Sequence, residues 1–153
     1  MADSSILDSQ RFRLPTMIMI LLNGVATAMM LTGVNVALPD IAKDLNVDAR
    51  TLSWIPMGYL VASAASVLAF GRLADMYGRK RFYLMGTLGV IISSILTALS
   101  QDVGQLIAGR VAQGICAGAL YSTMFAILSS VYPESKRGEA IGYSVSAVYL
   151  GLA

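Results

Sequence analysis

The chain has 153 residues, of which 56% are apolar and 13% are charged, and it carries a net charge of +2 with no histidine. Because soluble domains carry about 25% charged residues, this composition excludes an ordinary water-soluble domain and favours a membrane protein. The cations are grouped in loops and form no basic face, so nucleic-acid binding is not expected. The single cysteine, Cys116, excludes an internal disulfide.

The first apolar run extends over residues 14–38 and follows a polar segment, residues 1–13, that we predict to be a cytoplasmic tail. At about 1.5 Å per residue, a helix of this length crosses a hydrocarbon core of about 30 Å with some tilt. Pro39 is expected to end this span, because proline interrupts helical hydrogen bonding. Residues 39–51 are expected to form a hydrated loop with a short amphipathic helix.

Four more apolar runs follow in the chain. The second is expected to begin at an N-cap provided by Thr51 or Ser53, with Trp54 and Tyr59 near the membrane interface that amphipathic rings prefer. The last run is shorter than the bilayer is thick, so we interpret the chain as a fragment of a longer protein. The sequence predicts an all-α membrane protein with a transmembrane domain over residues 14–153 and helices at about 14–38, 52–73, 82–99, 105–131 and, incompletely, 140–153.

The distribution of Lys and Arg predicts the orientation of the spans. The tail and the loops at residues 71–81 and 132–139 hold eight of the eleven cations, whereas the two opposite loops hold only Lys43 and Arg50. Loops rich in cations stay on the cytoplasmic side, so the N-terminus is predicted to be cytoplasmic. The expected location is the cell inner membrane, crossed several times, with the lipid bilayer as the surrounding partner.

Arg110 is the one charged residue well inside a predicted span. A charge near the bilayer centre costs about 2.5–3.5 kcal/mol on insertion scales, so it requires an explanation. In one interpretation the side chain extends to the outer surface, towards Asp102. In the other it faces a water-filled cavity, where it gates, binds or couples transport, with Asn35 at a suitable depth to be its partner.

The first span carries polar and soft side chains that are candidates for lining a substrate cavity. The alternative is that the polar ones form interhelical hydrogen bonds, which are common in membrane bundles, and that the methionine is ordinary packing. The candidates are Asn23, Thr27, Met30, Thr32 and Asn35.

A charged hinge at residues 71–81 separates two apolar runs. Gly78 is expected to adopt a left-handed conformation, which glycine reaches without steric penalty. Asp75 and Arg79 are four residues apart and form either a solvated ion pair, contributing under about 1 kcal/mol, or a latch that is closed in one conformation only.

No Asp or Glu lies inside a predicted span, so this stretch holds no buried carboxylate that could carry a proton. The sequence has no paired cysteines, no phosphate-binding glycine loop and no nucleophile elbow. We therefore expect neither an enzyme nor a metal site.

Three motifs resemble those of the major facilitator superfamily. The hinge is similar to the signature loop between helices two and three of that family, and a motif in the fourth span is similar to one of its drug:proton antiporters. A motif at the end of the first span is similar to one of the 14-helix branch, although Met30 stands where that branch has an acidic residue. The three motifs are Gly71-x-Leu73-Ala74-Asp75-x-x-Gly78-Arg79-Lys80, Arg110-x-x-Gln113-Gly114-x-x-x-Gly118, and Asn35-Val36-Ala37-Leu38-Pro39 with Thr32.

The resemblance implies a bundle with three-helix repeats in each half and a central site that opens alternately to each side. It further implies proton-coupled efflux of drugs or other amphipathic small molecules, powered by the proton gradient without a cofactor. The proton-carrying carboxylate and the remaining helices would lie beyond Ala153. The implied coupling or gating residues are Arg110, Gln113, Gly114 and Gly118, and the implied latch residues are Gly71, Asp75, Gly78, Arg79 and Lys80.

Two other functions stay open at this stage. One is a uniporter or symporter of a metabolite on the same fold. The other is a truncated membrane protein that does not transport and instead binds a partner through its faces of small residues.

Overall fold

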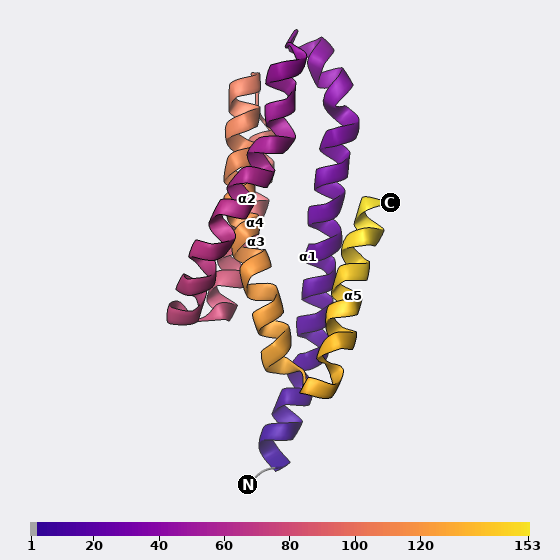
Figure 1. Cartoon of the computed structure of the whole chain (residues 1–153), viewed down its shortest axis with the longest axis vertical. Helices are drawn as coiled ribbons and strands as arrows, with labels where there is room; N and C mark the ends of the chain where they lie inside the picture. The colour runs from indigo at the N-terminus through magenta and orange to yellow at the C-terminus, as the bar shows by residue number, and fades with distance from the viewer. Residues whose placement is uncertain (1–2) are drawn as a thin grey trace. The chain divides into compact units, whose positions relative to one another are not determined.

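The computed structural model of the chain describes residues 3–153, with side chains from Leu14 onward. The predicted cytoplasmic tail, residues 1–13, falls outside the residues with described side chains and stays a prediction. Residues 3–153 form five helices and no strand, which confirms the predicted all-α fold (Figure 1). The helices are α1 (Asp3–Asp44), α2 (Ala49–Tyr77), α3 (Arg79–Ala98), α4 (Val103–Val131) and α5 (Glu134–Leu152).

Four of the helices described from Leu14 onward, α1 to α4, are long and apolar enough to cross a membrane. The helix α5 has 19 residues, but four of its first six are charged. Charges in the first turns shorten the apolar part of α5, so it is not among the candidate spans.

The helix α1 continues past Pro39 to Asp44, so the predicted end of the first span was wrong. Proline removes only one donor from the helical ladder, and helical bonds resume beyond it, with the Leu45 N–H donating to the Ile41 carbonyl at 3.0 Å. The loop predicted at residues 39–51 is correspondingly reduced to a short turn through Asn46, which has a φ of 49°.

The helix α2 begins after Asp48, which lies three residues before Thr51 and five before Ser53, the two predicted caps. The Asp48 carboxylate accepts a hydrogen bond from the Thr51 N–H at 3.3 Å, as aspartate at an N-cap commonly does. Hydrogen bonding from Thr51 lowers the pKa of the Asp48 carboxyl below its ordinary value. The start of α4 is stabilised in the same way, because the Asp102 carboxylate accepts from the Gln105 N–H at 2.9 Å.

The hinge between α2 and α3 consists of Gly78 alone, which has a φ of 103°. This confirms the positive φ expected at this glycine, although its ψ of 120° lies outside the left-handed helical region. Because one residue reverses the chain, α2 extends to Tyr77 and α3 begins at Arg79, so the charges expected in a loop lie in helical turns.

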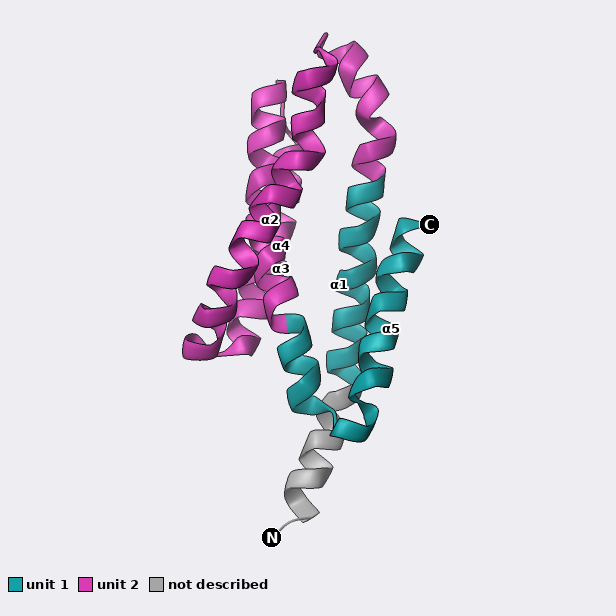
Figure 2. Cartoon of the chain, viewed as in Figure 1, with its two compact units in different colours: residues 1–32, 124–153 teal, residues 33–123 magenta. Residues whose placement is uncertain are grey.

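The chain divides into two compact units, coloured separately in Figure 2. Unit 1 comprises residues 1–32 and 124–153, and unit 2 comprises residues 33–123. In unit 1, α5 packs closely on α1: a Cβ added at Gly151 would lie 2.6 Å from the Val25 carbonyl oxygen and 2.7 Å from the Ala28 Cβ. Unit 2 contains α2, α3, most of α4 and the last part of α1, and it holds both residue groups described next.

Candidate functional site

The helix α4 packs against α2 through two glycines. A Cβ added at Gly114 would overlap the Tyr59 carbonyl oxygen and lie 3.0 Å from the Ala62 Cβ. A Cβ added at Gly118 would lie 3.0 Å from the Ser63 carbonyl oxygen. Small residues let two helix backbones approach each other in this way. The structure therefore gives Gly114 and Gly118 a packing role, and their predicted part in coupling stays a prediction.

The opposite side of α4 packs against α3 in a similar manner. A Cβ added at Gly89 would lie 2.5 Å from the Cys116 Sγ, and one added at Gly86 would lie 3.1 Å from the Cys116 carbonyl oxygen. The α4 helix is thus held between α2 and α3 with little space on either side, and side chains on its two flanks are buried within unit 2.

Arg110 lies on this enclosed part of α4 and is only 1% exposed. It is the largest of the fully buried side chains among the described residues. Asp102, towards which the side chain was suggested to extend, is exposed and caps the start of α4 instead. The interpretation that Arg110 reaches the outer surface is therefore wrong, because its guanidinium is retained between the helices.

Three side chains from three helices fix the guanidinium of Arg110. Its Nη1 donates to the Gln113 Oε1 at 2.7 Å, and the Gln113 Nε2 donates to the Ser94 Oγ of α3 at 2.9 Å. The Tyr59 ring of α2 covers the guanidinium face, with the Arg110 Cζ 4.6 Å from the ring centroid. Gln113 is itself 2% exposed, so this polar chain is shielded from the surroundings.

Tyr59 was expected near the membrane interface, and its depth in a membrane stays a prediction. The side chain is 5% exposed, and its hydroxyl lies 3.3 Å from the hydroxyl of Tyr121 on α4. Tyr59 is buried because it lies on the face of α2 that packs against α4. Sequence reasoning missed Tyr59 as a neighbour of Arg110, and it missed Ser94 and Tyr121 as partners of Gln113 and Tyr59, since only the close packing of three helices brings these residues together.

The interactions of Arg110 offset much of its insertion cost but leave part of the group unsatisfied. A hydrogen bond to a charged group contributes about 1.5–3 kcal/mol, and a cation–π contact about 0.5–2 kcal/mol. Together they are comparable to the insertion cost of about 2.5–3.5 kcal/mol. The Nε and Nη2 of Arg110, however, are buried and have no hydrogen-bond partner among the described residues. An unpaired buried donor costs about 1–3 kcal/mol, so these two N–H groups make the site incomplete.

Acidic residues do not complete the site within the part of the chain with described side chains. Every Asp and Glu between residues 14 and 153 is exposed. Asn35, proposed from its depth as a partner of Arg110, is also exposed, whereas the observed hydrogen bond of Arg110 goes to Gln113. The buried cation therefore has no acidic partner in the described structure.

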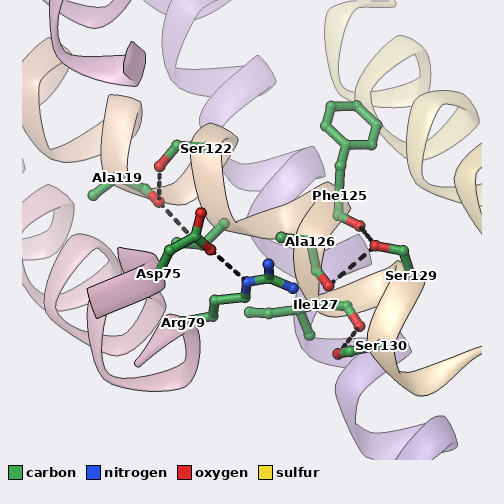
Figure 3. A network of polar contacts seen from close by, with 10 residues as sticks. Asp75, Arg79, Ala119, Ser122, Phe125, Ala126, Ile127, Ser129 and Ser130 are labelled. Atoms are coloured by element: carbon green, nitrogen blue, oxygen red, sulfur yellow. Dashed lines mark hydrogen bonds and ion pairs between the residues drawn. The ribbon is translucent and has the colours of Figure 1, made fainter. Parts of the chain in front are cut away.

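The second group of candidate residues surrounds the hinge. Figure 3 shows the Asp75 and Arg79 side chains pointing toward each other, with the Arg79 Nε donating to the Asp75 Oδ1 at 2.9 Å. The side chains of Arg79 and Asp75 are 43% and 61% exposed. The pair joins the last turn of α2 to the first turn of α3 across Gly78, so it forms within unit 2.

The remaining residues of the hinge motif have simpler environments. A Cβ added at Gly71 would make only ordinary contact, 3.9 Å from the Ser122 Cβ. Lys80 is exposed at the start of α3. Gly78 is thus the glycine of this motif that the backbone conformation requires.

The cavity candidates of α1 are divided between the two units. Asn23, Thr27, Met30 and Thr32 belong to unit 1, and Asn35 belongs to unit 2. The Asn23 Nδ2 donates to the Met19 carbonyl at 3.0 Å, and the Thr27 Oγ1 donates to the Asn23 carbonyl at 2.7 Å. These two side chains therefore bond to their own helix, and the role of all five candidates in binding substrate stays a prediction.

Comparison with known proteins finds relatives among membrane transporters. The family model described as Major Facilitator Superfamily matches residues 20–153. Multidrug resistance protein 3 of Bacillus subtilis (strain 168) is 39% identical over 123 residues, which cover 80% of this chain and 24% of that protein. The riboflavin transporter RibZ of Clostridioides difficile (strain 630) is 32% identical over 117 residues, or 76% of this chain and 26% of that protein.

A third relative is the puromycin resistance protein pur8 of Streptomyces alboniger. It is 35% identical over 112 residues, which cover 72% of this chain and 22% of that protein. The chain therefore spans about a quarter of the length of the curated relatives it matches.

Gln113→Ala should destabilise unit 2, because it leaves the Arg110 Nη1 as a third unpaired donor. The expected loss is about 1.5–3 kcal/mol, observed as a lower unfolding midpoint of the purified protein in detergent. Gln105→Ala is the matched control, since Gln105 lies on the same helix but is exposed, and it should change the midpoint little. Equal midpoints for the two variants would show that the Gln113 bond does not support Arg110.

Proposed function

Because the chain belongs to the Major Facilitator Superfamily, we propose that the complete protein is a secondary transporter that works by alternating access. Its proposed activity is the export of drugs and similar amphipathic small molecules in exchange for protons. The proton gradient supplies the energy, and no bound cofactor is required. Two relatives bear names of drug resistance, which supports this substrate class.

The observation that carries the proposal is the buried, incompletely paired guanidinium of Arg110 in a membrane-spanning helix. A charge in this position is expensive, and intramembrane charges are characteristic of substrate, ion or proton pathways. We assign Arg110 and its partner Gln113 to coupling or gating. Gly114 and Gly118 support this role by bringing α4 close enough to α2 for Tyr59 to cover the guanidinium.

The hinge pair is assigned to conformational switching. An exposed ion pair of this kind contributes at most about 1 kcal/mol, so it can be broken and re-formed during a transport cycle. Gly71, Asp75, Gly78, Arg79 and Lys80 constitute the proposed latch that favours the outward-open state.

The substrate cavity is assigned to polar and soft side chains of α1, in a transporter that contains further helices not present in this chain. The relatives are about four times as long as the region they share with this chain, which supports the need for those helices. The protein is placed in the cell inner membrane with its N-terminus in the cytoplasm, as the loop charges favour. The proposed cavity residues are Asn23, Thr27, Met30, Thr32 and Asn35.

A second function is transport of a metabolite. The similarity to a riboflavin transporter favours this alternative. It predicts accumulation or export of riboflavin by cells that express the complete protein, without efflux of a cationic dye.

Arg110→Ala should abolish efflux of ethidium from energised cells that express the complete transporter, because the coupling group is lost. The amount of protein in the membrane should stay at the parental level. Arg50→Ala, which removes an exposed cation outside the site, should leave the efflux rate unchanged. Ethidium efflux by Arg110→Ala at the parental rate would exclude the proposed coupling role.

Asp75→Asn should shift the transporter away from the outward-open state by weakening the pair with Arg79. Since an exposed pair contributes at most about 1 kcal/mol, the shift should be no more than about fivefold. The measurement is the labelling rate of a cysteine placed at Asn35 in a Cys116→Ser background, with an impermeant maleimide added outside. Slower labelling is expected for Asp75→Asn and not for the exposed control Asp44→Asn, whereas an unchanged rate in both would contradict the latch.

A further inference from the structure

The guanidinium of Arg110 has a fixed end, a covered face and one unused edge. Its Nη1 end is bonded to Gln113, and its face lies against the Tyr59 ring. The Nε and Nη2 atoms are buried without a hydrogen-bond partner in the described residues. The side chain cannot turn this edge toward Gln113 without losing the bond at Nη1, so the edge has a fixed direction within unit 2.

The two unused donors form a fork. In the planar guanidinium, Nη2 lies on the same side as the Nε hydrogen, so the two N–H groups are adjacent and nearly parallel. This spacing matches the two oxygens of a carboxylate, which guanidinium groups bind through two parallel hydrogen bonds. A single hydroxyl or carbonyl oxygen would have to be shared between both donors and would leave the charge of the guanidinium unbalanced. The pair of unpaired atoms is therefore selective for a planar anion with two acceptors.

The described part of the chain does not provide that anion from its own side chains. Its Asp and Glu residues are all exposed, and the polar side chains linked to Arg110, directly or through Gln113 and Tyr59, carry only amide and hydroxyl groups: Gln113, Ser94, Tyr59 and Tyr121. The hydroxyl and amide groups carry no charge to balance a guanidinium. The chemistry that completes the site is a carboxylate from outside these residues.

We propose that the Nε and Nη2 edge of Arg110 binds the carboxylate of the transported molecule, so that the substrates include amphipathic monocarboxylic acids. The inference rests on the proposed transport function and specifies its substrate class. The helices around Arg110 are apolar, so the remainder of the molecule is expected to be aromatic or aliphatic. A carboxylate supplied by another part of the complete transporter is the competing source, and the experiment distinguishes the two.

The test compares 1-naphthoate with 1-naphthamide, which share a ring system and differ in charge. Binding of each compound to the purified complete transporter at pH 7 is measured by titration calorimetry. Naphthoate should bind at least about tenfold more tightly than naphthamide, as expected for two hydrogen bonds to a charged group. Arg110→Lys keeps the charge but lacks the planar fork, so it should reduce this preference. Arg50→Lys is the matched control and should behave as the parental protein.

A second measurement uses only the parental protein, so it does not depend on whether a variant folds. In the parental protein, phenylglyoxal modification of Arg110 is followed by mass spectrometry, with and without each compound. Naphthoate should protect Arg110 at least about tenfold better than naphthamide, in line with its tighter binding.

Three outcomes would overturn the inference. Equal binding of the two compounds by the parental protein indicates that another part of the transporter supplies the carboxylate. A preference for naphthoate that is undiminished in Arg110→Lys indicates a different anion site. Equal protection of Arg110 by both compounds excludes the fork as the binding group.

The proposed function fails separately from this inference. If ethidium efflux depends on Arg110 but naphthoate is not preferred, the proposed transport function stands and the proposed carboxylate site is excluded. If naphthoate binds at Arg110 but ethidium, riboflavin and naphthoate are not transported, the proposed carboxylate site stands and the proposed transport function is excluded.

Discussion

A guanidinium enclosed by apolar helices depends on polar groups that the protein itself provides. In unit 2 these groups come from all three helices around Arg110: Gln113 from α4, Ser94 from α3 and the Tyr59 ring from α2. The hydrogen bonds form a chain in which each member orients the next. Loss of any one member would leave a buried donor or an uncovered charge, so the packing of the three helices and the position of the cation depend on each other.

Small residues make this arrangement possible. Gly114 lies against the Tyr59 carbonyl and Gly89 lies against Cys116, so α4 approaches both neighbours closely. Larger side chains at these positions would separate the helices and withdraw the tyrosine ring from the guanidinium. The glycines of the fourth-helix motif therefore affect the electrostatics of the site indirectly, because they set the distance between the α4 and α2 backbones. The hinge pair is local to the turn between α2 and α3, because Asp75 and Arg79 are joined across one glycine and remain partly solvated.

The sequence predicted the features that depend on local chemistry. Apolar runs predicted the spans, and the glycine in the charged hinge predicted the residue with positive φ at Gly78. The predicted helix boundaries were wrong where they rested on the effect of a single residue. Pro39 did not end α1, because a single missing donor did not stop the helix, and Asp48 capped α2 in place of Thr51 or Ser53. Tyr59 is buried because its face of α2 packs against α4. The sequence could not decide whether Arg110 is exposed or buried. Its burial depends on the packing of three helices, and the spacing of residues along one helix does not reveal that packing.

The environment of the Arg110 guanidinium can be measured directly by NMR of the protein in detergent micelles, with arginine labelled with ¹⁵N. The Nε–H signal of Arg110 is assigned by its disappearance in Arg110→Lys. The structure predicts a signal shifted by the ring current of Tyr59, restored by Tyr59→Leu towards the position of exposed arginines, and slow to exchange with water. A signal that coincides with those of exposed arginines, exchanges rapidly and does not respond to Tyr59→Leu would contradict a buried Arg110 covered by the tyrosine ring.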